Sequence, residues 1–240
     1  MLPIVHHAHY QAPLRPGHRF PMSKYGYLRE ALVQRRLLAP GRYIAPKAAE
    51  ERQVALAHDT AYVARAFGQT LGPDEVRRIG LPGTERVIRR ARLAASGTLL
   101  AAWLAMEHGI AANSAGGSHH AGPEGGSGFC VFNDVAVSVA NLLAQGVPGP
   151  VLVVDADVHQ GDGTARIFED DPRVFTFSLH AEKNFPARKA RSDLDIGLPD
   201  RLEDAAYLEA LRSGLDRALV AGRPSLVFYN AGVDVWKGDR

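Results

Sequence analysis

The chain has little cysteine, no long apolar run and no marked excess of either charge. Cys130 is the single cysteine among 240 residues, so no intrachain disulfide can form. No apolar stretch approaches the roughly 20 residues that a membrane-spanning helix needs. The first ten residues, MLPIVHHAHY, lack the charged and long apolar segments of a secretory signal peptide. These absences predict a soluble protein outside the membrane, and we expect a cytoplasmic location.

The charge balance gives no sign of a nucleic-acid partner. The formal net charge is +2, and 22% of the residues are charged. The one dense basic run, RVIRRAR at 86–92, lies in a helical pattern and has no interleaved aromatic side chains. We therefore interpret it as the solvated face of a helix and expect no direct nucleic-acid binding. The oligomeric state stays open.

Several common catalytic motifs are also absent. The chain contains no G-x-x-x-x-G-K-[ST] phosphate loop, no G-x-S-x-G nucleophile elbow and no H-E-x-x-H zinc helix. Cys130 is better explained as a small buried residue than as a nucleophile. The histidines near the N-terminus, His6, His7 and His9, are interpreted as incidental. The site must therefore be sought in other polar clusters.

Hydrophobic patterning predicts alternating helices and strands. We expect helices over 22–38, 48–68 with a break near His58 and Asp59, 85–107 ending at Gly109, 132–145, 163–169 and 203–221. We expect strands over 110–115, 150–155, 173–179 and 225–229. This alternation predicts an α/β fold of three layers, α/β/α, with a mainly parallel central sheet in a single domain.

Three polar clusters directly follow predicted strands. They are GGSHH at 116–120, DADVHQGD at 155–162, and NAGVD at 230–234 followed by Gly238 and Asp239. In parallel sheets, ligands bind beyond the carboxyl ends of the strands. The second cluster ends a buried apolar strand with three carboxylates, which repel one another unless a positive partner is present.

A metal ion would resolve that repulsion. Side chains alternate along extended chain, so Asp155, Asp157 and His159 start on one side. An Asp and a His two residues apart, joined by one remote carboxylate, form a plausible zinc ligand set of zero net charge. Two alternatives stay open at this point: a solvated Asp-rich turn, and a calcium or magnesium site, which a histidine ligand suits poorly.

Together these segments resemble the zinc-dependent histone deacetylase family, in the arginase/deacetylase fold, and most of all its bacterial class IV-like members. The resemblance spans residues 9–239. It rests on HYQAPLRPGHRFPMSKYGYL, LAHDTAYV, AGGSHHAGPEGGSGFCVFND, VVDADVHQGDGTARIF, FTFSLHAEKNFP and NAGVDVWKGDR. It implies removal of an acyl group, acetyl or longer, from acylated lysine in a protein or peptide or from a related small amine.

The resemblance also implies roles for individual residues. The Zn²⁺ ligands would be Asp157, His159 and Asp239. His119 and His120 would form a tandem catalytic pair, with His120 as general base. Two further catalytic-site carboxylates would orient that pair, Asp155 on His119 and Asp162 on His120.

The same resemblance implies a substrate channel and a second cation. The channel would be lined by Gly128, Phe129 and Phe185, with Arg19 near its inner end. A potassium ion would be held by main-chain groups around Asp155, Asp157, His159, Ser178 and Leu179.

The sequence departs from the family pattern in three respects. The family has an electrophilic tyrosine well after its last zinc ligand, where this sequence ends, so we expect a catalytic domain over 1–240 that lacks its C-terminal part. Gln160 stands where many members have a second histidine. Ser118 replaces a bulkier residue, which predicts room for longer acyl groups. The alternatives are a catalytically impaired metal-binding fold, an acetylpolyamine amidohydrolase, and a two-manganese ureohydrolase of the same fold.

Overall fold

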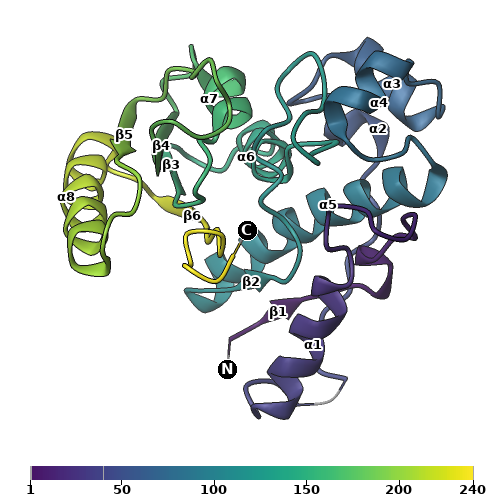
Figure 1. Cartoon of the computed structure of the whole chain (residues 1–240), viewed down its shortest axis with the longest axis horizontal. Coiled ribbons are helices and arrows are strands. Elements are labelled where there is room, and N and C mark those ends of the chain that lie inside the picture. Colours follow the sequence, from purple (N-terminus) through teal and green to yellow (C-terminus); the bar gives the residue numbers. More distant parts are fainter. Residues whose placement is uncertain (1, 40, 240) are drawn as a thin grey trace. The chain divides into compact units, whose positions relative to one another are not determined.

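The computed structural model describes residues 2–39 and 41–239. The chain divides into two compact units, Met1–Leu142 and Leu143–Arg240, and each is described here by itself. Figure 1 follows their elements along the sequence. Within the described residues, no helix combines the length and apolar character needed to cross a bilayer.

The first unit is mainly helical. Its helices are α1 (Lys24–Gln34), α2 (Glu51–Val54), α3 (Thr60–Phe67), α4 (Pro73–Ile79), α5 (Glu85–His108) and α6 (Asp134–Ala144), the last of which reaches the second unit. A short 3-10 helix, η1 (Ala8–Tyr10), precedes them. Two strands, β1 (Ile4–Val5) and β2 (Ala112–Asn113), pair in parallel.

Two of the sequence signals for helix ends in this unit are confirmed, whereas the predicted helix over 22–38 is shorter, Lys24–Gln34. The predicted break near His58 and Asp59 separates α2 from α3. α5 ends at Gly109, which adopts φ +83° and donates its N–H to the carbonyl of Ala105. Glycine enters this left-handed conformation at little cost and so stops helices. The prediction missed α4, whose seven residues are too few to show a helical period.

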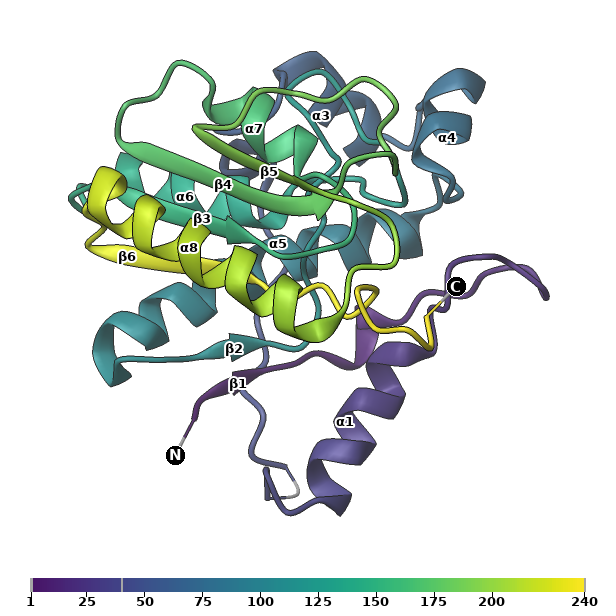
Figure 2. The ribbon, with the colours of Figure 1, turned by 60° about the vertical axis from the view of Figure 1, so that its left-hand side comes forward.

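The second unit is built on a four-stranded parallel sheet. Its strands are β3 (Val151–Asp155), β4 (Val174–Ala181), β5 (Leu194–Leu198) and β6 (Leu226–Asn230), in the order β5-β4-β3-β6. Figure 2 shows the strands side by side, with α8 (Asp204–Gly222) along one face. In Figure 1, α7 (Asp162–Phe168) lies on the other side of this sheet. The fold class is therefore α/β with a mainly parallel sheet, as predicted.

Burial explains why β3 was readable from the sequence and β5 was not. All five residues of β3 are buried between β4 and β6, which is typical of the centre of a parallel sheet. β5, with sequence LDIGL, is an edge strand with a buried leucine at each end only. The core of this unit comprises Leu152, Val154, Phe177, Leu179, Leu194, Leu198 and Ala218.

Candidate functional site

The carboxyl ends of three neighbouring strands bring polar residues together. Asp155 of β3 is in register with Ser178 of β4 on one side and with Asn230 of β6 on the other. Asp155 is only 4% exposed. Its Oδ1 accepts the backbone N–H of Asp157 at 3.2 Å and the Nδ2 of Asn230 at 3.0 Å. The strand end is thus fixed just before the chain turns toward His159.

Two carboxylates converge on one imidazole beyond this edge. The Nδ1 of His159 lies 2.9 Å from Oδ1 of Asp157 and 3.1 Å from Oδ2 of Asp234. One donor atom of each residue lies within 4.8 Å of the others, and all three side chains are half-buried. Ligands about 2.0–2.1 Å from a tetrahedral zinc are about 3.3 Å apart, so small side-chain shifts would accommodate the ion.

The electrostatics of this group favour a cation. Hydrogen bonds to Asp157 first and Asp234 second raise the pKa of His159 to about 9, despite the opposing effect of burial. Two carboxylates that share one nitrogen therefore attract positive charge. A divalent ion bound to both carboxylates and a neutral imidazole would leave no net charge, and oxygen and nitrogen are the donors zinc accepts.

The third member of the group corrects the sequence-based prediction. Asp234, rather than Asp239, joins Asp157 and His159. The Oδ1 of Asp234 accepts the backbone N–H of Val158 at 3.0 Å, which anchors the carboxylate on the segment that carries Asp157 and His159. Asp239 is exposed, in a turn where its N–H donates to the carbonyl of Trp236.

Chain length explains the difference between the two aspartates. β6 ends at Asn230, four residues before Asp234 and nine before Asp239. Gly232, between Asn230 and Asp234, lies directly on Asp157, where an added Cβ would overlap the Asp157 backbone. This close approach turns the chain so that the nearer aspartate reaches His159. The proximity of NAGVD to the strand end was the signal that would have identified it.

The remaining predicted residues of this unit surround the same segment. The ring of Phe185 stands edge-on to His159, with centroids 6.4 Å apart, and the side chain is 43% exposed. Ser178 is buried, and its Oγ accepts the N–H of Gly161 at 3.3 Å. Leu179 follows it in the buried core. The residues of the predicted potassium site thus come from β4, from the end of β3 and from the turn after β3, and the site stays a prediction.

Asp162 has a partner that the sequence did not suggest. It begins α7, is buried, and forms an ion pair with Arg166 at 2.5 Å, one helical turn along. Its predicted action on His120, like that of Asp155 on His119, concerns residues of the other unit and stays a prediction.

The tandem histidines lie in the first unit. His119 and His120 are both buried, and their ring centroids are 4.1 Å apart. Gly128 packs against His120 so closely that a Cβ there would press on the imidazole. Phe129 follows with φ +65°, a conformation that costs a non-glycine residue about 1–2 kcal/mol. Such strain often marks a functional position.

A buried carboxylate organises the backbone before these histidines. Asp134 accepts the N–H of Ser118 at 2.7 Å, the hydroxyl of Thr98 at 2.6 Å and the N–H of Gly117 at 3.3 Å. Burial raises its pKa, while these donors oppose the shift. Asp134 is the last residue of the FND segment at 132–134, for which the sequence predicted no role.

A buried histidine holds the other side of the same loop. The Nδ1 of His58 lies 2.8 Å from the carbonyl of Gly122, and its Nε2 accepts the N–H of Asn133 at 3.0 Å. A ring nitrogen that accepts a hydrogen bond carries no proton, so His58 is neutral. Burial lowers its pKa to about 4.

Two ring side chains lie beside Phe129, which was predicted to line the channel. Its ring lies 5.4 Å from that of Phe20 and 6.2 Å from that of His18, measured between centroids. Arg19, between them in sequence, is exposed, and its predicted place at the inner end of a channel stays a prediction.

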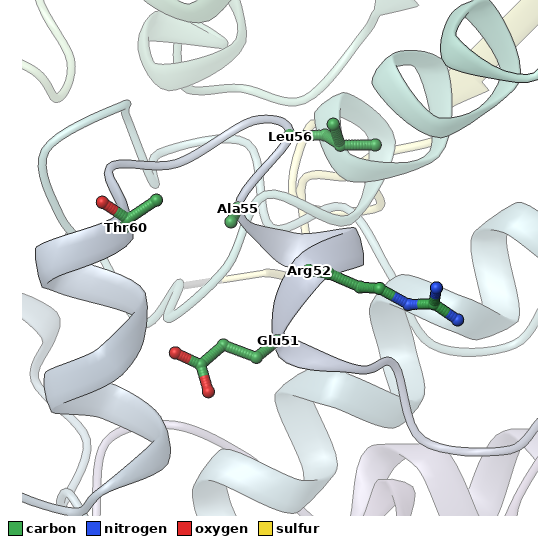
Figure 3. Close-up of a pocket in the computed structure, with 5 residues that line it drawn as sticks. All are labelled: Glu51, Arg52, Ala55, Leu56 and Thr60. Atoms are coloured by element: carbon green, nitrogen blue, oxygen red, sulfur yellow. The ribbon is translucent and has the colours of Figure 1, made fainter.

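A surface hollow in the first unit has no chemical features of a site. It measures about 520 Å³ and is lined by Glu51, Arg52, Ala55, Leu56 and Thr60, drawn in Figure 3. None of these residues belongs to a predicted site. Within residues 2–39 and 41–239, the only group able to hold a metal ion is Asp157, His159 and Asp234.

Comparisons with known proteins identify the family and the fold. The family described as "Histone deacetylase domain" matches residues 18–240. The crystal structure of the HDA15 HD domain superposes with a TM-score of 0.83 at 22% sequence identity, covering 99% of this chain and 74% of that one. At this identity the superposition shows the fold, which is the one expected from the sequence.

Sequence relatives have varied names. An uncharacterized protein of Picosynechococcus sp. is 48% identical over 99% of this chain and 79% of its own length. The acetoin utilization protein AcuC of Staphylococcus aureus (strain COL) is 29% identical over 91% of this chain, and Histone deacetylase 2 of Arabidopsis thaliana is 30% identical over 92%. The chain spans 61% and 60% of those last two proteins. Because the family match extends over nearly the whole sequence, this chain belongs to the histone deacetylase family.

Proposed function

We propose that this chain carries the metal centre and the histidine pair of a zinc-dependent hydrolase that removes an acyl group from acylated lysine or a related amine. The observation that carries the proposal is the convergence of Asp157, His159 and Asp234, whose donor atoms lie within 4.8 Å of one another. Membership of the histone deacetylase family supports the same reaction class.

Asp157, His159 and Asp234 would hold the zinc ion, with Asp234 in place of the predicted Asp239. Three protein ligands leave a fourth position open, as in catalytic rather than structural zinc sites. The chemistry that zinc supplies in such a site is activation of a water molecule and of the amide carbonyl. The main chain around Asp155, Asp157, His159, Ser178 and Leu179 would hold a potassium ion.

The histidine pair would move the proton. A ring nitrogen of His120 would accept a proton as water adds to the acyl carbon. The same nitrogen would deliver it to the amine as the carbon–nitrogen bond breaks, which yields a carboxylate and a free amine. Burial keeps both rings away from bulk water, and Asp134 and His58 fix the loops on either side of them.

The aromatic residues suit an uncharged acyl-lysine. Phe129 and Phe185 would contact the apolar stem of the side chain, and Gly128 would leave room beside His120. An acylated lysine has no charge to desolvate, whereas the free lysine that leaves does. The binding site would therefore prefer substrate to product.

The matched pair Asp234→Asn and Asp239→Asn tests the metal centre. Both substitutions remove one carboxylate near the end of the chain, and Asp234 is the one that joins the group with Asp157 and His159. We expect Asp234→Asn to lose most bound zinc and Asp239→Asn to retain it, measured by elemental analysis after dialysis. Normal zinc in the Asp234 variant, or loss in the Asp239 variant, would contradict this ligand assignment.

Turnover distinguishes the hydrolase from an impaired metal-binding fold. We expect a fluorogenic acyl-lysine peptide to be hydrolysed, inhibition by a hydroxamate, and loss of turnover with retained zinc in His120→Ala. Zinc binding in the wild-type protein without hydrolysis of acyl-lysine or acetylpolyamine would reject the proposed activity while leaving the metal centre intact.

A further inference from the structure

The residues that alternate with the metal-binding pair have contacts of their own. Asp157 and His159 face the candidate metal centre, whereas Val158 binds the end of β4 and Gln160 binds the long connection between β4 and β5, residues 182–193. The carbonyl of Val158 accepts the N–H of Ala181, the last residue of β4, at 2.9 Å, just before that connection begins. Gln160 binds the far end of the same connection.

Gln160 is 1% exposed, and its amide is fully hydrogen-bonded. The Nε2 donates to the carbonyl of Ala190 at 2.9 Å and to Oδ1 of Asp195 at 2.8 Å. The Oε1 accepts the N–H of Ala190 at 2.8 Å. A side chain that pairs with both backbone groups of one residue holds that residue in a single position, much as a neighbouring strand would.

The clamp continues into β5. The other oxygen of Asp195 accepts the N–H of Ser192 at 2.8 Å, so Asp195 closes the last turn of the connection. Phe185 lies between the two anchored ends, beside His159. Within the connection, the Nζ of Lys189 donates to the carbonyls of Asn184 and Pro186, on either side of Phe185. The next residue, Ala190, is the one that Gln160 holds.

We propose that Gln160 is a positioning residue, which sets the place of Phe185 relative to the metal centre by clamping Ala190 and Asp195. The part of this inference that concerns substrate rests on the proposed function, in which Phe185 contacts the acyl-lysine stem. Within one segment, residues 157–160, Asp157 and His159 would then bind the metal, and Gln160 would position the wall of the channel that contains Phe185. The distance between the metal and Phe185 would therefore depend on the conformation of these four residues.

Limited proteolysis tests the clamp without any assumption about activity. The connection contains four trypsin sites, at Lys183, Arg188, Lys189 and Arg191. Gln160→Glu keeps one acceptor for Ala190 but turns both donor contacts into repulsions. We expect native-state cleavage in this connection to become about tenfold faster, because losing a buried charge-assisted hydrogen bond costs at least about 1.4 kcal/mol. Mass spectrometry identifies the cut sites.

A compensating substitution separates the clamp from a general loss of stability. In Gln160→Glu/Asp195→Asn, the Asn amide donates to the new carboxylate, so one bond of the clamp is restored with reversed polarity. We expect the double variant to be cleaved more slowly than either single variant. Gln160→Met removes the bonds without adding charge and should resemble Gln160→Glu. Leu211→Ala, in the core contact of α8, is the control for destabilisation away from the clamp.

Kinetics test the consequence for substrate. With zinc content unchanged, Gln160→Glu should raise KM for an acyl-lysine peptide about tenfold and change kcat by less than about threefold, because binding rather than chemistry is disturbed. In the double variant, KM should fall part of the way back to the wild-type value. The clamp would be overturned if Gln160→Glu and Gln160→Met were cleaved at the wild-type rate. It would also be overturned if cleavage in this connection were no faster in them than in Leu211→Ala. Faster cleavage with unchanged KM would overturn its role in substrate binding. An inactive wild-type protein would instead reject the proposed function, and the proteolysis would still decide on the clamp.

Discussion

At the scale of single residues, the three aspartates of the 155–162 segment are paired in different ways. Asp155 accepts backbone and Asn230 donors, and Asp162 pairs with Arg166. Asp157 and Asp234 share a partner, His159, and they raise its pKa to about 9. Two carboxylates on one imidazole concentrate negative charge at the place where a metal ion would bind.

Another histidine makes the folded protein sensitive to acid. The folded state keeps His58 neutral down to about pH 4, whereas the unfolded chain protonates it below about pH 6.5. Because the unfolded state then binds the extra proton, the free energy of unfolding falls as the pH drops through this range. We expect His58 to contribute a loss of roughly 3 kcal/mol between pH 6.5 and pH 4.

Chemical denaturation at several pH values measures that loss. His58→Gln, which can donate and accept but does not titrate, should flatten the pH dependence. The control His108→Gln removes an exposed histidine at the end of α5 and should leave the dependence unchanged. An equally steep pH dependence in His58→Gln would show that other groups are responsible.

At the scale of elements, close packing decides how α8 meets the sheet. Gly214 of α8 is buried against the ring of Phe177 in β4, where an added Cβ would overlap the ring and approach Ile196 to 2.9 Å. Glycine is otherwise a poor residue for the middle of a helix, by about 1 kcal/mol relative to alanine. The helix therefore gives up local stability to come close to the strands.

The sign of Gly214→Ala tests which effect is larger. Overpacking of a core costs about 1–3 kcal/mol, more than the gain in helix propensity. We expect a net loss of about 1–2 kcal/mol in the free energy of unfolding, measured with denaturant. Ser213→Ala, on the neighbouring exposed position, should change it by less than about 0.5 kcal/mol. A stabilised Gly214→Ala would mean that α8 can move away from β4 without penalty.

At the scale of the whole molecule, metal binding should be linked to stability. The two converging carboxylates repel each other in the folded state, and an ion that binds only the folded chain relieves that cost. We expect zinc at about 100 times its Kd to raise the free energy of unfolding by about 2.7 kcal/mol. Thermal unfolding across a zinc titration measures this effect. Asp234→Asn should abolish it and Asp239→Asn should keep it; a zinc response in both would place the ion elsewhere.

Much of this protein was readable from its sequence because local chemistry determined it. The apolar run of β3 followed by DADVH predicted a buried strand and a polar cluster at its end, and Gly109 predicted the end of α5. These features depend on residues a few positions apart, where hydrophobic period and backbone preference suffice.

Other features depend on contacts between distant segments. The strand period did not reveal β5, since an edge strand buries few side chains. The family resemblance implied Asp239 as the third ligand, but the close approach of Gly232 to Asp157 brings Asp234 to His159. The clamp of Gln160 on Ala190 and Asp195 joins residues 30 and 35 positions apart. The sequence by itself determined the central strand β3 and the polar segment that follows it; tertiary structure decided which carboxylate joins Asp157 and His159, because only packing sets the path of the chain after β6.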